Sequence, residues 1–225
     1  MTLAIASGAG ILGKRYGPEF PIGIMAAMVV IAAILANKLV AIGPFAAPGG
    51  IVVISSTFLI TDILSEKWGR EVAQRAVWVG FYSLLALVIT LFIATRWEAP
   101  FFAKEQADAF ASVLGLTPRI TLASIIAYLF SQNHDVWAFH FWKNVSGGKH
   151  LWLRNNASTI VSQAIDTVIF ITIAFYGIFP IVPLIIDMII LKTVIALLDT
   201  PFIYIVSWVV DRSPMKENLS FIKSN

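Results

Sequence analysis

Long apolar blocks follow one another along this chain, with only short polar segments between them. The six longest blocks approach or exceed the roughly 20 residues that an α-helix needs to cross a bilayer. In lipid, every backbone polar group must find a partner within the protein, and uninterrupted blocks of this length satisfy that need as helices. Outer-membrane barrel strands are shorter and alternate in polarity. The pattern therefore predicts an all-α, polytopic membrane protein.

Composition supports this class and excludes others. Hydrophobic residues make up 58% of the chain, whereas soluble domains have roughly 45–50%. The absence of cysteine excludes a disulfide framework and a thiolate metal site. The net charge of +3 comes from basic residues spread over the segments between the blocks, which does not indicate a nucleic-acid-binding surface.

We expect a bundle of six transmembrane helices within residues 20–211, preceded by an N-terminal cytoplasmic segment (1–19) and followed by a cytoplasmic tail (212–225). Asn155 or Asn156 is the expected N-cap of the fifth helix. Residues 99–115 contain aromatic and charged side chains and are expected to form a short helix on the membrane surface. The predicted spans are residues 20–42, 51–67, 73–95, 119–142, 157–179 and 182–210.

The basic residues predict the orientation of the bundle. With the N-terminus inside, eleven Lys and Arg residues lie in segments on the cytoplasmic side and three lie outside. Because short cytoplasmic loops carry an excess of Lys and Arg, both termini are expected to be cytoplasmic. The chain is thus expected in a cytoplasmic (inner) membrane.

Polar side chains inside the predicted helices are the candidate functional residues. A charge at the centre of a membrane helix costs about 2.5–3.5 kcal/mol on insertion scales, so these groups must face protein or water. Five carboxylates face only two lysines, and the excess must be protonated, bind a cation, or accept hydrogen bonds from a ligand. The residues are Asn37, Lys38, Asp62, Gln132, Asp135, Gln163, Asp166, Asp187, Lys192 and Asp199.

The fourth and fifth predicted helices repeat one polar spacing. Gln132 and Asp135 share a helical face, and so do Gln163 and Asp166. At about 1.5 Å per residue, each Gln comes level with the Asp of the antiparallel neighbour. Two interpretations remain open: reciprocal Gln–Asp hydrogen bonds that hold the two helices together, or a ligand or ion site.

Lys192 lies at the same depth as Asp166, so an ion pair between them is expected. Asn37 and Lys38 fall in the outer third of the first predicted helix, where they could line an entrance. For Lys38 the alternative is that its side chain extends to the outer interface.

Two short patterns do not indicate sites. SGGKH (146–150) lacks the first glycine and the Ser/Thr of a phosphate-binding loop, so the chain is expected to carry no ATPase of its own. His134 and His140 are six residues apart and fall on different helical faces, which argues against a metal site. Neither a metal nor a cofactor is expected.

Several stretches resemble the queuosine precursor transporter family, also grouped as vitamin uptake transporters. They are ISSTFLITDILSEKWG, SQNHDVWAFHFW and GGKHLWLRNNASTIVSQAIDTVIFITIAF, and the resemblance covers roughly residues 37–199. It includes polar positions within the helices as well as their hydrophobicity. The first twenty residues add nothing to it.

The resemblance implies a six-helix inner-membrane protein of bacteria or archaea, similar in architecture to the substrate-binding components of energy-coupling-factor transporters. It also implies import of 7-cyano-7-deazaguanine or related deazapurines for queuosine in tRNA. A carboxylate could accept both N–H donors on one edge of such a base, and an aromatic ring such as Tyr128 could stack on it. The expected binding residues are Asn37, Asp62, Tyr128, Gln132, Asp135, Gln163, Asp166 and Lys192.

Two other functions are compatible with the sequence. One is an intramembrane enzyme that uses the Asp residues as acid–base groups, although no nucleophile or metal signature accompanies them. The other is a binding subunit for another heterocycle or vitamin that requires an external ATPase. The sequence leaves open whether the protein forms a homo-oligomer or works with such an energising module.

Overall fold

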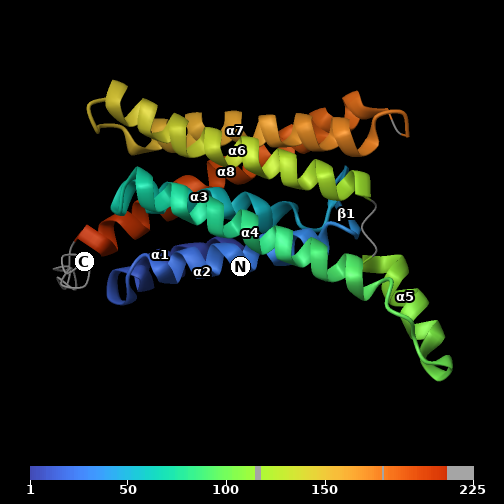
Figure 1. The fold of residues 1–225 in the computed structure, drawn as a ribbon. Coiled ribbons are helices and arrows are strands. Elements are labelled where there is room, and N and C mark those ends of the chain that lie inside the picture. The colour runs from blue at the N-terminus through green and yellow to red at the C-terminus, as the bar shows by residue number, and fades with distance from the viewer. Residues whose placement is uncertain (115–117, 179, 212–225) are drawn as a thin grey trace.

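The computed structural model describes residues 1–114, 118–178 and 180–211, and the expected cytoplasmic tail (212–225) lies outside these ranges. The described part is an elongated bundle whose long helices run along a common direction (Figure 1). A hairpin and a short outlying helix are attached to it. The bundle comprises α1 (Thr2–Tyr16), α2 (Glu19–Leu35), α3 (Ile51–Lys67), α4 (Arg70–Ala94), α6 (Pro118–Val145), α7 (Leu151–Phe175) and α8 (Ile181–Asp211).

The expectation of an all-α fold is wrong at one place, because β1 (Leu39–Ile42) and β2 (Phe45–Pro48) pair as an antiparallel hairpin. The first predicted helix was extended to residue 42, whereas α2 ends at Leu35. The side-chain amide of Asn37 donates to the carbonyls of Ala33 and Ile34, at 3.2 and 3.1 Å, and so satisfies the end of α2. Gly43 then turns the chain at a φ of 60°.

Helix α1 was not predicted as part of the bundle. It contacts α2, α3 and α8, and its buried side is made of small residues such as Ala6, Ala9 and Gly10. A Cβ atom on Gly10 would lie 2.9 Å from a methyl carbon of Ile63, so glycine permits this close approach. The predicted boundary at residue 20 therefore does not mark the edge of the helical bundle.

The first residues of α1 lie partway along the bundle and not at one of its ends. The hydroxyl of Ser56, in the central part of α3, donates to that of Thr2 at 3.0 Å. The last turn of α1 reaches the end of the bundle, where Lys14 donates to the carbonyl of Val210 at 2.6 Å. Only the C-terminal end of α1 thus lies near the face that is expected to be cytoplasmic.

The other predicted helices are present with shifted boundaries. Asn155 and Asn156 are not N-caps, because α7 begins four residues before Asn155, directly after His150, which has a φ of 56°. The segment 99–115 contains the short 3₁₀ helix η1 (Phe101–Ala103) and α5 (Lys104–Leu114), neither of which has a buried residue. Its place on a membrane surface stays a prediction.

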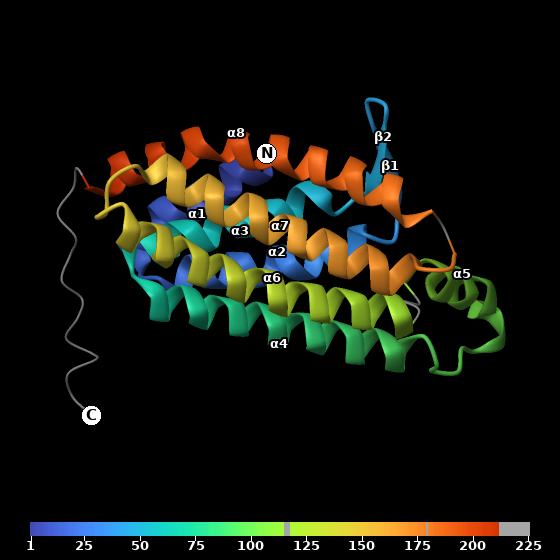
Figure 2. The ribbon, with the colours of Figure 1, turned by 90° about the horizontal axis from the view of Figure 1, so that it is seen from above.

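Among the residues that the structure describes, three helices, α4, α7 and α8, are long and apolar enough to cross a membrane, and α2 is a shorter apolar helix. The structure therefore agrees with a multi-pass membrane protein, while six spans remain a prediction. The hairpin and α5 lie at the same end of the bundle, and the link between α7 and α8 is there too (Figure 2). The α3–α4 and α6–α7 connections lie at the opposite end.

Helix α3 is the centre of the bundle and positions most of the polar groups. It contacts α1, α2, α4, α6, α7 and α8, and all its residues from 55 to 65 are buried. Ser, Thr and Asp side chains on this helix therefore cannot reach lipid or water on any face. They need polar partners within the protein, and Ser56, Thr57 and Thr61 donate to carbonyls of their own helix.

Candidate functional site

A cavity lies between the helices on the hairpin side of the bundle. Its walls come from α2, α3, α4, α6, α7 and α8, and Pro48 of β2 also contributes. Ala32, Ala33 and Ala36 supply a wall of small side chains from α2. Three polar side chains and two aromatic rings define its chemistry: Ser124, Asp166 and Lys192, with Tyr128 and Phe170.

An ion pair forms the polar wall of this cavity. Lys192 Nζ on α8 lies 2.6 Å from Asp166 Oδ2 on α7, which confirms the expected pairing. The Ser131 hydroxyl on α6 donates to the other carboxylate oxygen at 3.2 Å. Lys192 and Asp166 are 3% and 14% exposed, so the charges are held largely away from solvent. Each carboxylate oxygen can still accept a further hydrogen bond from a ligand.

Two aromatic rings line the same cavity. Tyr128 is 3% exposed, and its hydroxyl donates to the carbonyl of Val77 on α4 at 3.2 Å. That bond fixes the ring against α4. Gly80 of α4 makes room for the Tyr128 hydroxyl, since a Cβ atom at position 80 would overlap it. Phe170, one turn after Asp166 on α7, is the second ring. The cavity thus offers aromatic faces next to a charged pair, which suits a flat polar heterocycle.

Four expected binding residues lie elsewhere, in the interface of α3, α6 and α7. Asp62, Gln132, Asp135 and Gln163 are at most 1% exposed, and none of them lines the cavity. Each has a hydroxyl partner. Thr159 donates to Asp62 at 2.9 Å, Thr61 to Asp135 at 3.1 Å and Ser55 to Gln163 at 3.5 Å, while Gln132 donates to Thr57 at 2.9 Å.

Reciprocal Gln–Asp bonds between α6 and α7 are not formed among the described residues. Gln132 and Gln163 bond to hydroxyls of α3 instead. The Ser131–Asp166 bond links α6 to α7, as does a 2.9 Å contact between His134 Nδ1 and the Ser162 hydroxyl. The prediction of reciprocal bonds compared only the positions of the side chains along the helix axis. The partners also depend on the direction in which each side chain points, and both Gln side chains point towards α3.

Asn37, the remaining expected residue, lies at the exposed C-terminal end of α2, where its amide bonds to its own helix. It does not line the cavity. Of the eight expected residues, the structure thus brings Tyr128, Asp166 and Lys192 together around the cavity.

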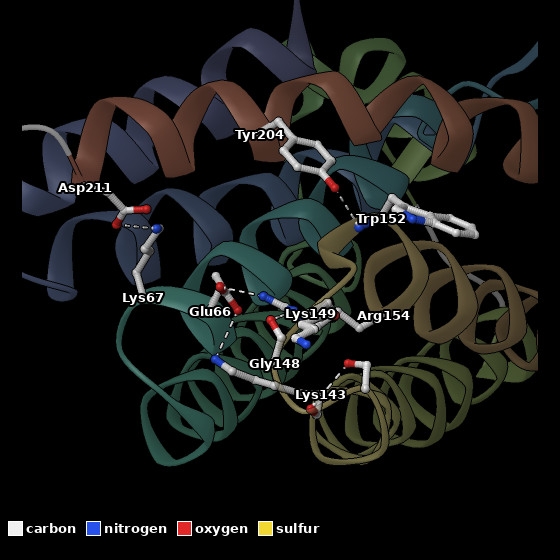
Figure 3. A network of polar contacts seen from close by, with 10 residues as sticks. Glu66, Lys67, Lys143, Gly148, Lys149, Trp152, Arg154, Tyr204 and Asp211 are labelled. Carbon is white, nitrogen blue, oxygen red and sulfur yellow. Dashed lines mark hydrogen bonds and ion pairs between the residues drawn. The ribbon is translucent and has the colours of Figure 1, made fainter.

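A third set of polar groups was missed from the sequence. Glu66 on α3 accepts from Lys143 on α6 at 3.0 Å and from Arg154 on α7 at 2.6 Å (Figure 3). Arg154 is 3% exposed and also donates to the carbonyls of Gly148 and Lys149, at 2.8 and 3.2 Å. These bonds tie α3, α6 and α7 together at the end away from the hairpin. The basic residues around the α6–α7 connection are evident in the sequence, but residue spacing does not reveal that Glu66 on α3 is their acidic partner.

Within the described ranges, no group of three or more His, Cys, Asp or Glu side chains is arranged to hold a metal ion.

Comparison with known proteins identifies the family. Residues 48–206 match a family model described as "Putative vitamin uptake transporter". Over 159 residues the chain is 35% identical to the "Probable queuosine precursor transporter" of Bacillus subtilis (strain 168), a match that covers 69% of each protein. It is 29% identical over 122 residues to the "Queuosine precursor transporter" of Escherichia coli (strain K12), with 53% of this chain and 51% of the relative covered.

A "Probable queuosine precursor transporter" of Haemophilus influenzae is also 29% identical, over 120 residues, with 53% of this chain and 48% of the relative covered. No solved structure matches the chain. The family match includes all the bundle helices from α3 to α7 and most of α8, together with every residue of the polar wall of the cavity. The chain belongs to the vitamin uptake transporter family, and its relatives in three bacteria carry the name queuosine precursor transporter.

Proposed function

We propose that this protein imports a queuosine precursor, 7-cyano-7-deazaguanine or a related deazapurine, across the cytoplasmic membrane. The names of the three relatives support this function. The observation that carries it is the cavity, in which the Asp166–Lys192 pair lies beside Tyr128 and Phe170. The relatives are named as transporters, so the proposal is transport and not catalysis.

The chemistry of the ligand fits this cavity. A 2-amino-4-oxo deazapurine is flat and presents adjacent N–H donors on one edge, next to a carbonyl. In the proposed mode, Asp166 accepts from the donor edge and Lys192 donates to the carbonyl. Tyr128 or Phe170 stacks on the ring, and the alanine wall of α2 leaves space for its thickness. We restrict direct contact to Tyr128, Asp166, Lys192 and Phe170, because the other expected residues do not line the cavity.

The proposed orientation places the Glu66 network on the cytoplasmic side and the hairpin outside. Its support is the excess of Lys and Arg around the α3–α4 and α6–α7 connections, in the ends of the helices that flank them as well as in the loops. Because the chain has no cysteine, single cysteines can be introduced without a background signal. Cysteines in residues 68–69 or 146–149 should resist an impermeant thiol reagent in intact cells and react after permeabilisation. A cysteine at exposed Ala41 of the hairpin should react in both, and the reverse pattern would contradict the orientation.

The proposed substrate can be tested through tRNA. A bacterium that cannot make the deazaguanine precursor, and that lacks its own importer, should regain queuosine when it expresses this chain and receives precursor at low concentration. Queuosine in tRNA is measured by mass spectrometry. Ile169→Leu, which changes an apolar side chain and keeps its volume, is the matched control and should rescue fully. If the wild-type chain reaches the membrane and gives no queuosine where a known importer does, the assignment is wrong.

A further inference from the structure

Two carboxylates in the centre of the bundle form no ion pair with any residue whose position is described. Asp62 and Asp135 are 0% exposed, and each accepts one hydroxyl hydrogen bond through Oδ2. Their Oδ1 atoms have no partner within the described part of the chain. The ion pairs found there involve Glu66, Asp166 and Asp211, not these two residues. Two unpaired buried charges would cost several kcal/mol each.

The charged groups around Asp62 do not remove this imbalance. Asp135 of α6 and Asp199 of α8 both act on it as like charges, and Asp199 is itself 1% exposed with two unpartnered oxygens. Arg154 of α7 is the nearby cation, but its guanidinium already bonds to Glu66. Tyr82 of α4 is 62% exposed. The other ionisable groups of α1, α2 and α4 lie near the ends of these helices, and they are Lys14, Arg15, Tyr16, Glu19, Arg70, Glu71 and Arg75.

A buried amide on α7 adds an independent sign of a missing partner. Asn155 is 1% exposed, and neither its oxygen nor its nitrogen has a partner among residues with described positions. It lies one turn before Thr159, on the same helical face, and Thr159 is the residue that donates to Asp62. Unpartnered polar atoms at such depth cost about 1–3 kcal/mol each. The Asp62 carboxylate, the Thr159 hydroxyl and the Asn155 amide thus lie in one region of the bundle, and the carboxylate and the amide both have polar atoms without a hydrogen-bond partner.

We infer that Asp62 and Asp135 form a proton-binding site that is separate from the ligand cavity and that couples import to proton entry. A proton bound by either carboxyl removes one of the two charges and turns that group into a hydrogen-bond donor. A metal ion fits less well, because among the described residues no group of three or more His, Cys, Asp or Glu side chains is arranged to hold one. The coupling role rests on the proposed transport function, whereas the proton site itself does not.

The position of the pair suggests how a proton could affect the inner end of the bundle. Asp62 and Glu66 are one turn apart on α3, and Arg154 acts on both. When Asp62 is ionised, it competes with Glu66 for Arg154. When it is protonated, Arg154 is left to Glu66, and the bonds between α3 and α7 at that end are strengthened. Proton binding and release would therefore bias the network shown in Figure 3.

Infrared spectroscopy of the full chain in lipid tests the proton site without any ligand. A protonated carboxylic acid absorbs apart from a carboxylate, and its band shifts in heavy water. We expect this band at neutral pH, and its intensity should fall in both Asp62→Asn and Asp135→Asn. Asp108→Asn is the matched control, because α5 has no buried residue and the change should leave the band as it is. Asparagine resembles the neutral acid in shape, so both variants should fold. A neutral-pH spectrum with no band, or a band unchanged in both variants, would overturn the inference.

Coupling is tested in proteoliposomes with a trapped pH dye and radiolabelled 7-cyano-7-deazaguanine. With one proton per neutral ligand, a gradient of one pH unit should accumulate the ligand about tenfold. Asp62→Asn should still bind ligand, because it lies outside the cavity, but should lose the accumulation and the ligand-driven dye signal. Wild-type uptake without proton entry, or accumulation driven by sodium alone, would overturn the coupling. Absence of ligand binding by the wild type would instead reject the proposed substrate, and the infrared result would still decide on the proton site.

Discussion

Replacement of Lys192 by methionine is expected to abolish ligand uptake and to destabilise the protein. The change preserves much of the side-chain volume but removes the cation that lies 2.6 Å from Asp166. Breaking a buried ion pair by removing one partner costs about 3–5 kcal/mol, because an uncompensated charge remains. If Asp166 then takes up a proton, it can no longer accept both N–H donors of the ligand. Binding measured by calorimetry should weaken at least ~100-fold, equivalent to about 2.8 kcal/mol.

A double variant separates stability from binding. Lys192→Met combined with Asp166→Asn removes both charges, so thermal stability should return towards the wild-type value while binding stays lost. Lys104→Met on the exposed helix α5 is the control for removing a lysine and should change neither property. Wild-type affinity in the Lys192→Met variant would show that the ion pair is structural and that the ligand binds elsewhere.

The helices of the bundle were largely predictable, because a run of apolar residues that must satisfy its backbone in lipid has few alternatives to a helix. The hairpin was harder to see. Residues 39–42 are apolar and continue the block of α2, so hydrophobicity alone extends the helix through them. The helix ends earlier because the Asn37 side chain bonds to the carbonyls of its last turn. This competition between side chain and backbone is local and is not visible in a hydrophobicity pattern.

Helix α1 was missed for a different reason. Its sequence is rich in Gly and Ala and short for a spanning helix, so it does not resemble a transmembrane block. Small residues bury little area each, but they let helices approach closely and so pack well inside a membrane bundle. A Cβ atom on Gly10 would lie 2.9 Å from Ile63, and one on Gly13 would lie 3.1 Å from Trp68. This packing depends on partners that are distant in sequence.

The polar residues of the candidate site could be predicted from the sequence, but the partners of each side chain could not. Charged residues inside apolar blocks are unusual, and their depth along each helix follows from a simple count. This was sufficient for the Asp166–Lys192 pair. Which helix each side chain faces depends on the rotation of every helix about its axis, and α3 occupies the centre of the bundle. Gln132 and Gln163 therefore bond to Thr57 and Ser55, and the polar residues separate into a cavity and a buried cluster.

Replacement of Arg154 by methionine is expected to cause the largest loss of stability outside the cavity. Its guanidinium is 3% exposed and lies 2.6 Å from Glu66, and it also satisfies the carbonyls of Gly148 and Lys149 before α7 begins. The variant leaves these acceptors without a buried donor, at a cost of about 3–5 kcal/mol. For a chain of this size, that corresponds to a fall in melting temperature of about 6–20 °C, measured by thermal unfolding in detergent.

Lys143→Met is the matched comparison, because Lys143 binds the same carboxylate from a partly exposed position. Its side chain is 32% exposed, and its nitrogen lies 3.0 Å from Glu66. Ion pairs that water can reach contribute about 0–1 kcal/mol, so the melting temperature should fall by no more than about 4 °C. Arg154→Lys should resemble Arg154→Met more than wild type, since an ammonium group cannot reproduce the planar set of donors that joins Glu66 to two carbonyls. Equal losses for Lys143→Met and Arg154→Met would show that charge alone, and not burial of the guanidinium, stabilises this end of the bundle.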